Sequence, residues 1–184
     1  MRAAGRALSS PAKPDKAVLV VAALAAPSID LAAVESELRE AFGPIDLSLP
    51  FAPFEQTKYY ESEMGEGLVR GFYSFGAEAD PGSLWRAKTM TNGLESKFAG
   101  RGKRAVNLDP GILTLTNLVL ASGKPAAHRV YLDGGIYAEI EYLFRFGGFT
   151  PLEWTYPDYR DGRTLAWFNE VRERLRQRRR AAKC

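Results

Sequence analysis

The sequence predicts a single α+β domain with a ferredoxin-like βαββαβ core, extended towards the C-terminus by a helix, a β-hairpin and a last helix. Three observations predict this fold. Strand-like and helix-like hydrophobic patterns alternate in the order of the split βαβ motif. The chain has 184 residues, 46% of them hydrophobic, which suits one domain with its own core. An Asp-Gly-Gly turn between two alternating segments adds the hairpin.

The first half of the expected core follows from three hydrophobic patterns. The apolar run over residues 17–26 predicts a buried strand. Ser28 or Asp30 then caps a helix over residues 31–42, where apolar side chains recur at helical spacing. Residues 45–51 alternate between apolar and polar, which predicts a half-buried strand.

The second half of the core repeats this order. Residues 68–75 predict a third strand, and Asp80 followed by Pro81 marks the start of a second helix. Gly100 ends that helix, and residues 105–108 predict a short fourth strand. In the ferredoxin-like form, these four strands make one antiparallel sheet with both helices on one face.

The extension begins with a segment whose interpretation is less direct. Pro110 to Ser122 is expected to form a short helix, although its threonine and leucine content also suits a strand. Residues 128–132 and 136–144 flank the Asp-Gly-Gly turn and predict the hairpin. Residues 164–180 predict the last helix.

Positive charge is concentrated at the two ends of the chain. The formal net charge is +3. Residues 172–184 contain seven Lys or Arg and one acidic residue, and residues 1–16 contain four Lys or Arg and one acidic residue. The stretch between them is therefore acidic. A basic segment can bind nucleic acid through counterion release, so a nucleic-acid partner is possible only through the C-terminal end. The alternative, which we favour, is a solvated helix end stabilised by the helix dipole.

Composition also sets the expected domain bounds. Residues 1–15 are expected to be a disordered leader, residues 16–176 a single α+β domain and residues 177–184 a basic tail. No apolar run approaches the ~20 residues of a membrane-spanning helix. The one cysteine, Cys184, excludes an internal disulfide and a cysteine-based zinc site. A cytoplasmic protein is expected, and no pattern identifies a cofactor or a metal.

Six fragments, in this order, resemble a bacterial family catalogued as the domain of unknown function 4416. The resemblance runs from about residue 16 to about residue 173. The fragments are FGPIDL, YYESEMGEGL, VNLDPG, LVLASGK, HRVYLDGGIYAEI and WTYPDY. The resemblance implies no particular reaction, so function has to be argued from the residues themselves.

Polar residues in three distant segments nominate one site. The candidate catalytic residues are His128, Asp109 and Glu63, and the candidate ligand-binding residues are Tyr60, Asn107, Lys124 and Arg129. Buried charges need partners of opposite sign, and this set contains both acids and bases. We therefore predict that the segments meet in one cleft near the start of the strand at His128. The alternative places each group at a separate solvated point.

Residue chemistry suggests a role for each part of this set. Lys124 and Arg129 could clamp a phosphate or a carboxylate. His128 is the only histidine and is the natural acid–base group near neutral pH. Asp109 and Glu63 could hold a divalent cation. The simpler alternatives are the exposed flanks of a hairpin, a helix cap at Asp109 and an acidic surface loop.

Two further groups of residues have both a functional and a structural interpretation. Glu139 and Glu141 lie two residues apart on a predicted strand, so they share one face. They could bind a cation, but a solvated hairpin face is the favoured interpretation. The aromatic residues within 154–159 could wall a ligand pocket, and packing over a sheet edge is favoured for them.

Two hypotheses about function remain open at the level of sequence, and the sequence does not decide whether the protein is an enzyme. The first is a binding module for a small anionic ligand, phosphate- or carboxylate-bearing, or for a protein partner. The alternative is a metal-assisted enzyme that acts on a phosphate-bearing or nucleotide substrate. An enzyme requires the candidate groups to converge within a few ångströms of one point.

Overall fold

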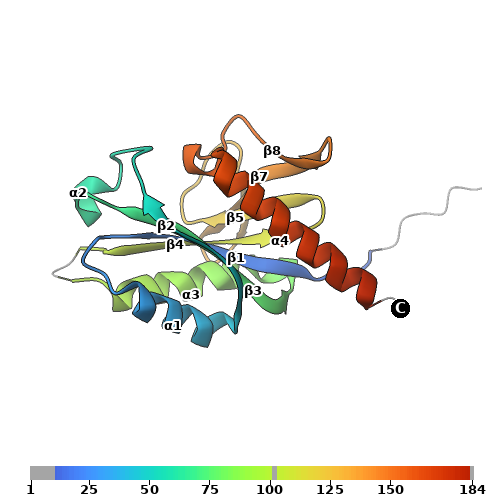
Figure 1. Cartoon of the computed structure of the whole chain (residues 1–184), viewed down its shortest axis with the longest axis horizontal. Coiled ribbons are helices and arrows are strands. Elements are labelled where there is room, and N and C mark those ends of the chain that lie inside the picture. The colour runs from blue at the N-terminus through green and yellow to red at the C-terminus, as the bar shows by residue number, and fades with distance from the viewer. Residues whose placement is uncertain (1–10, 101–102, 183–184) are drawn as a thin grey trace, which may run out of the picture.

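The computed structural model describes residues 11–100 and 103–182. One mixed α+β domain is built around a single antiparallel sheet of eight strands in the order β2-β3-β1-β4-β5-β7-β6, with β8 paired to β7 (Figure 1). The strands are β1 (Ala17–Ala25), β2 (Ile45–Pro53), β3 (Val69–Ala79), β4 (Val106–Leu113), β5 (Asn117–Ser122), β6 (Val130–Asp133), β7 (Ile136–Arg145) and β8 (Gly148–Pro151). The helices are α1 (Leu31–Phe42), α2 (Glu61–Met64), α3 (Leu84–Lys97) and α4 (Gly162–Ala181).

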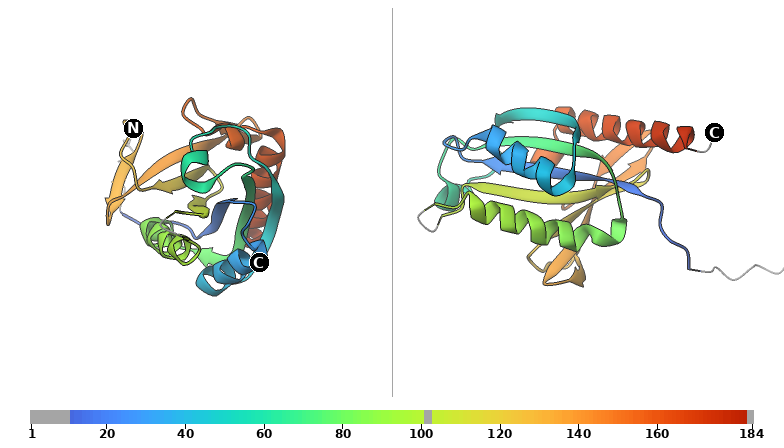
Figure 2. Two further views of the ribbon diagram at one scale, coloured as in Figure 1. Left: turned by 90° about the vertical axis from the view of Figure 1, so that its left-hand side faces the viewer. Right: turned by 90° about the horizontal axis from the view of Figure 1, so that it is seen from below.

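The sheet is covered by helices on both faces. Helices α1 and α3 lie on one face and the long helix α4 on the other (Figure 2). The central strand β1 explains this layering, because it is buried along its whole length and its side chains alternate between the two faces. Val21 and Ala23 join the core beneath α1 and α3, while Val20 and Ala22 join the core beneath α4.

The expected α+β class is confirmed, but the sheet is larger than the four strands of the expected core. The helix expected from Pro110 to Ser122 is wrong. Strand β4 continues through Pro110 to Leu113, and β5 returns antiparallel to it. Gly111 allows this pairing, because a Cβ atom there would lie 2.5 Å from a methyl group of Leu120. The threonine-rich turn is fixed by Thr114, whose hydroxyl accepts a hydrogen bond from the backbone N–H of Asn117 (3.0 Å).

The hairpin of β6 and β7 is confirmed, and its turn uses Gly134 and Gly135 at positive φ. Strand β6 begins only at Val130, so His128 precedes the strand. Helix α4 extends to Ala181, through most of the segment expected as a basic tail, and Arg179 pairs with Asp15 (2.9 Å). Residues 1–10 of the expected leader lie outside the described residues.

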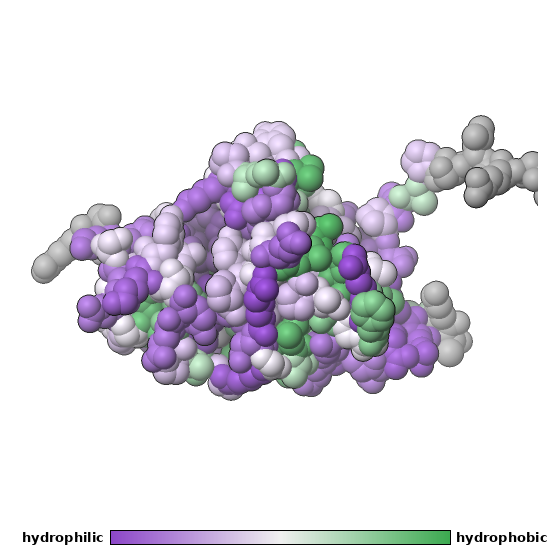
Figure 3. Space-filling model, turned by 90° about the horizontal axis from the view of Figure 1, so that it is seen from above, coloured by the Kyte–Doolittle hydropathy of each residue, from purple (hydrophilic) through white to green (hydrophobic). Residues whose placement is uncertain are grey.

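The surface of the domain is mainly hydrophilic on the face seen in Figure 3, where hydrophobic residues form separate small groups. Among residues 11–100 and 103–182, no helix is long and apolar enough to cross a membrane.

The sheet opens between β4 and β5, and this opening positions the site. Only Gly111–Leu113 of β4 pair with β5, whereas residues 106–110 pair with β1 alone. The free edge is satisfied by side chains of α3. Glu95 accepts a hydrogen bond from the backbone N–H of Leu108 (2.8 Å), and Lys88 donates one to the carbonyl oxygen of Leu108 (2.8 Å). Pro110, which lacks an N–H group, lies in the same stretch at no cost in ladder hydrogen bonds.

Candidate functional site

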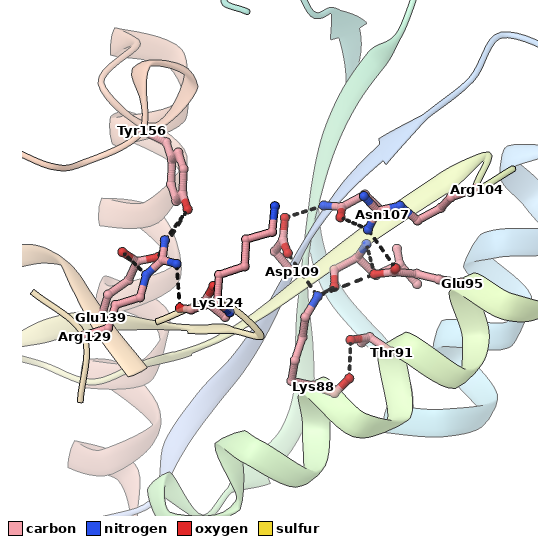
Figure 4. A network of polar contacts seen from close by, with 12 residues as sticks. Lys88, Thr91, Glu95, Arg104, Asn107, Asp109, Lys124, Arg129, Glu139 and Tyr156 are labelled. Atoms are coloured by element: carbon pink, nitrogen blue, oxygen red, sulfur yellow. Dashed lines mark hydrogen bonds and ion pairs between the residues drawn. The ribbon is translucent and has the colours of Figure 1, made fainter. Parts of the chain in front are cut away.

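A polar pocket of about 250 Å³ occupies this opening. Lys88 and Asn92 of α3 line one side, Asn107 and Asp109 of β4 the floor, and residues 120–124 the end of β5. Figure 4 shows two groups of bonded charges, one around Asp109 and one around Glu139, with Lys124 between them.

The first group is centred on Asp109. Its Oδ1 accepts a hydrogen bond from Lys88 (3.1 Å) and its Oδ2 one from Asn107 (2.5 Å). Burial alone would raise the pKa of Asp109. The positive charges of Lys88 and Arg70 and the two hydrogen bonds outweigh burial and lower the pKa below its usual value. Asp109 is therefore a carboxylate at neutral pH.

Arg104 extends this group to two other elements. Its Nη1 donates to Asn107 Oδ1 (2.7 Å) and to Glu95 of α3 (3.2 Å), and its Nη2 donates to Glu63 of α2 (2.8 Å). Glu95 also lies 3.5 Å from Lys88. The bases on this side of the pocket are thus held by carboxylates, as half-buried charges require.

The second group is centred on Glu139 of β7, which is 3% exposed. Arg129 binds both oxygens of Glu139, through Nε (3.1 Å) and Nη2 (3.0 Å). His128 Nε2 lies 2.9 Å from the same carboxylate, and the imidazole stacks on Trp154. The hydroxyl of Tyr156 accepts from Arg129 (2.8 Å). This wall therefore comes from β7, the segment before β6 and the segment before α4.

Lys124 differs from the other bases of the pocket. Its Nζ donates to the hydroxyl of Tyr59 and lies 4.7 Å from the centre of that ring. Within the part of the chain that the structure describes, no carboxylate lies within ion-pair distance of it. Its ammonium group therefore retains donors for a ligand.

Tyr60 adds a phenol to the pocket wall. Burial, and secondarily the negative charge of Asp109, raise the pKa of Tyr60 to about 12. The hydroxyl is consequently protonated at neutral pH and is available as a hydrogen-bond donor.

The expected solvated face at Glu139 and Glu141 is wrong, because both side chains are buried. The segment before α4 covers them, and the N–H of Tyr156 donates to Glu141 Oε2 (3.3 Å). Ile140, which lies between them, is exposed, and the pairing of β5 with β7 shifts register between Ile140 and Tyr142. Burial, and then the charge of Glu139, raise the pKa of Glu141 to about 8.

Five of the seven candidate residues line the pocket, and the other two each bond to a residue that lines it. The lining residues are Tyr60, Asn107, Asp109, Lys124 and Arg129. Glu63 reaches the pocket through Arg104 and His128 through Glu139. All seven residues therefore lie at this pocket or next to a residue that lines it. The roles expected for them stay a prediction.

Sequence reasoning missed the contributions of Lys88, Glu95 and Arg104. A signal for the first two was present, because Lys88, Thr91 and Glu95 follow i, i+3, i+7 spacing on the inner face of α3. Charged residues at core-facing positions of a helix need buried partners. Arg104 gave no comparable signal.

No group of three or more His, Cys, Asp or Glu side chains within residues 11–100 and 103–182 is arranged to hold a metal ion. Asp109 and Glu63, the expected metal ligands, instead accept hydrogen bonds from Lys88 and Arg104.

Fold and site together define an α+β domain whose single sheet opens around a polar pocket lined by paired charges and by Lys124. The profile of the domain of unknown function 4416 matches residues 15–175, and the chain belongs to that family. Neither the curated proteins nor the solved structures contain a significant match.

Proposed function

We propose that this pocket binds a small ligand with an anionic group, and that Lys124 contacts that group. One observation carries the proposal: Lys88, Arg104 and Arg129 are each held by a carboxylate, whereas Lys124 is held only by the neutral hydroxyl of Tyr59. Lys124 is exposed and lines the pocket, and an ammonium group without a counterion forms a charge-assisted contact with an incoming anion.

The size of the pocket supports a ligand of metabolite size. Its volume is about 250 Å³. Pockets that enclose drug-sized ligands are larger, from about 300 Å³ upwards. A short acid or phosphate ester fits this space better than a complete nucleotide does.

Titration with inorganic phosphate and with acetate, at constant ionic strength, tests the proposal. The charge-assisted contact predicts that Lys124→Met weakens binding of the preferred anion about tenfold or more. Arg145→Met is the matched control, because it removes one exposed positive charge at the end of β7, outside the pocket. Equal affinities in the two variants would contradict the proposal.

A metal-assisted enzyme for a phosphate-bearing or nucleotide substrate is the second candidate. The contact between His128 and Glu139 supports an acid–base role for His128 at the rim. A metal at Asp109 and Glu63 has less support, because basic side chains engage both carboxylates. Hydrolysis of phosphomonoesters that persists unchanged in His128→Ala would remove this candidate.

We also propose that β1 to β4, with α1 and α3, form a ferredoxin-like core to which the later strands add. The antiparallel order β2-β3-β1-β4 supports this assignment. The family match over residues 15–175 supports a single domain over residues 16–176.

A further inference from the structure

We propose that the anionic group is a phosphate, bound against the turn that follows β5, with the backbone N–H of Gly123 and the ammonium of Lys124 as its donors. This inference rests on the proposed function and assigns the class of ligand, a small phosphomonoester. Four observations carry it: the identity of Gly123, its N–H group, the charge of the pocket and the donors left unused around it.

Glycine at position 123 is required neither by packing nor by backbone conformation. A Cβ atom there would meet no atom of the protein within 4 Å, and φ lies outside the left-handed region. Gly111, by comparison, is needed because its Cβ would collide with Leu120. Gly123 lines the pocket, so the space beside its Cα is open to a ligand. A missing side chain at such a place lets the ligand approach the backbone closely.

The N–H of Gly123 is also available. The pairing of β5 with β7 ends at Ser122, and no group among the described residues accepts from Gly123. The next N–H, that of Lys124, donates to Ser122 Oγ (3.2 Å) and fixes the turn. The pocket thus has a backbone donor next to its one cation without a carboxylate, which is the combination that phosphate-binding loops use.

The charges around Gly123 leave one base for an anion. Four bases and two acids line the pocket, and Glu63 and Glu95 pair with Arg104 and Lys88. Lys124 is the lining base that no carboxylate among the described residues pairs with. A phosphomonoester, with a second pKa of about 6, is close to a dianion at neutral pH, so it interacts more strongly with this charge than a carboxylate does.

The unused donors favour a group with three oxygens over one with two. Lys124 donates one of its three ammonium N–H groups to the hydroxyl of Tyr59. Arg129 Nη1 donates one N–H to the carbonyl oxygen of Lys124 (2.8 Å), and its second N–H remains available as a donor. With the N–H of Gly123, these groups provide a donor for each of the three oxygens of a phosphate.

The experiment follows the protein by ¹⁵N–¹H NMR during titration with inorganic phosphate, and separately with acetate, at constant ionic strength. In the wild type we expect phosphate to bind more tightly than acetate and to move the Gly123 amide proton downfield. Gly123→Ala keeps the N–H but places a methyl group where the phosphate approaches, so we expect at least tenfold weaker binding. Gly162→Ala, at another glycine whose Cβ would meet no atom within 4 Å, is the control. The melting temperature should not fall in either variant.

Each outcome separates this inference from the proposed function. If Gly123→Ala binds phosphate as the wild type does while Lys124→Met does not, the Gly123 site is wrong and the anion pocket stands. If the wild type binds acetate but not phosphate, the ligand class is wrong and the anion pocket again stands. If neither anion binds, both proposals fail.

Discussion

Glu141 makes the stability of this protein depend on pH in an unusual direction. The carboxyl is fully buried on β7, and burial and then the charge of Glu139 raise its pKa from 4.5 to about 8. Between these two values the folded state holds a proton that the unfolded state has lost. The free energy of unfolding therefore falls as pH rises through this window, by about 1.4 kcal/mol per unit. Over the whole window the loss is about 5 kcal/mol.

The substitution Glu141→Gln isolates this effect, because glutamine has nearly the same shape and does not titrate. Urea denaturation of both proteins from pH 5 to pH 9 should give a difference in unfolding free energy that grows in favour of the variant up to about pH 8 and then stays constant. Glu153→Gln, which changes an exposed glutamate of the covering segment, is the matched control. Parallel curves for Glu141→Gln and the wild type would refute the reasoning.

Three further predictions concern the opening between β4 and β5. Gly111→Ala should cost about 1–3 kcal/mol of stability, because its Cβ would lie 2.5 Å from Leu120; an unchanged urea midpoint would contradict the observed pairing. Lys88→Met should cost about 3 kcal/mol, and a second change, Glu95→Gln, should recover part of it; additive losses in a double-mutant cycle would show that the pair is not coupled. Lys88→Met should also raise the pKa of Asp109, since the charge and hydrogen bond of Lys88 lower it; a ¹³C NMR titration of the carboxyl that shows no rise would exclude this role.

The elements that the sequence predicts well are those with local causes. Strand β1 is an apolar run that ends up buried along its length. Helix α1 begins where Asp30 accepts the N–H of Ala32 (2.9 Å), as an N-cap residue does. The hairpin of β6 and β7 follows from the glycines of its turn. In each case the deciding interaction lies within a few residues of the signal.

The helix predicted from Pro110 to Ser122 is wrong because the interactions that decide its structure are not local. Asp109 followed by Pro110 has the local chemistry of a helix start, and the same pair is acceptable at an unpaired strand edge. The choice between them is made by contacts across the hairpin, where Gly111 lies beneath Leu120. The burial of Glu139 and Glu141 is likewise decided by a covering segment that follows them in the chain.

The sequence singles out polar residues of the candidate site, but it misplaces some of them in the fold. Asn107 and Asp109, expected at the end of a strand, lie within β4, whereas Lys124 follows the end of β5. Lys88 and Glu95 lie inside a helix, where charged residues are usually solvated. Their spacing on the inner face of α3 indicates that they need buried partners, and the contacts with Leu108 of β4 show which partners they have.

The opening of the sheet explains why one base of the pocket is left for a ligand. A free strand edge inside the domain needs partners for its backbone groups, and Lys88 and Glu95 supply them at Leu108. Buried charges in turn need counter-charges, which Asp109 and Arg104 provide. Each of these residues is therefore committed to the fold. The ammonium of Lys124 contacts only the hydroxyl and ring of Tyr59 among the described residues, and it pairs with no backbone carbonyl and no carboxylate, so we expect its charge to act on a ligand.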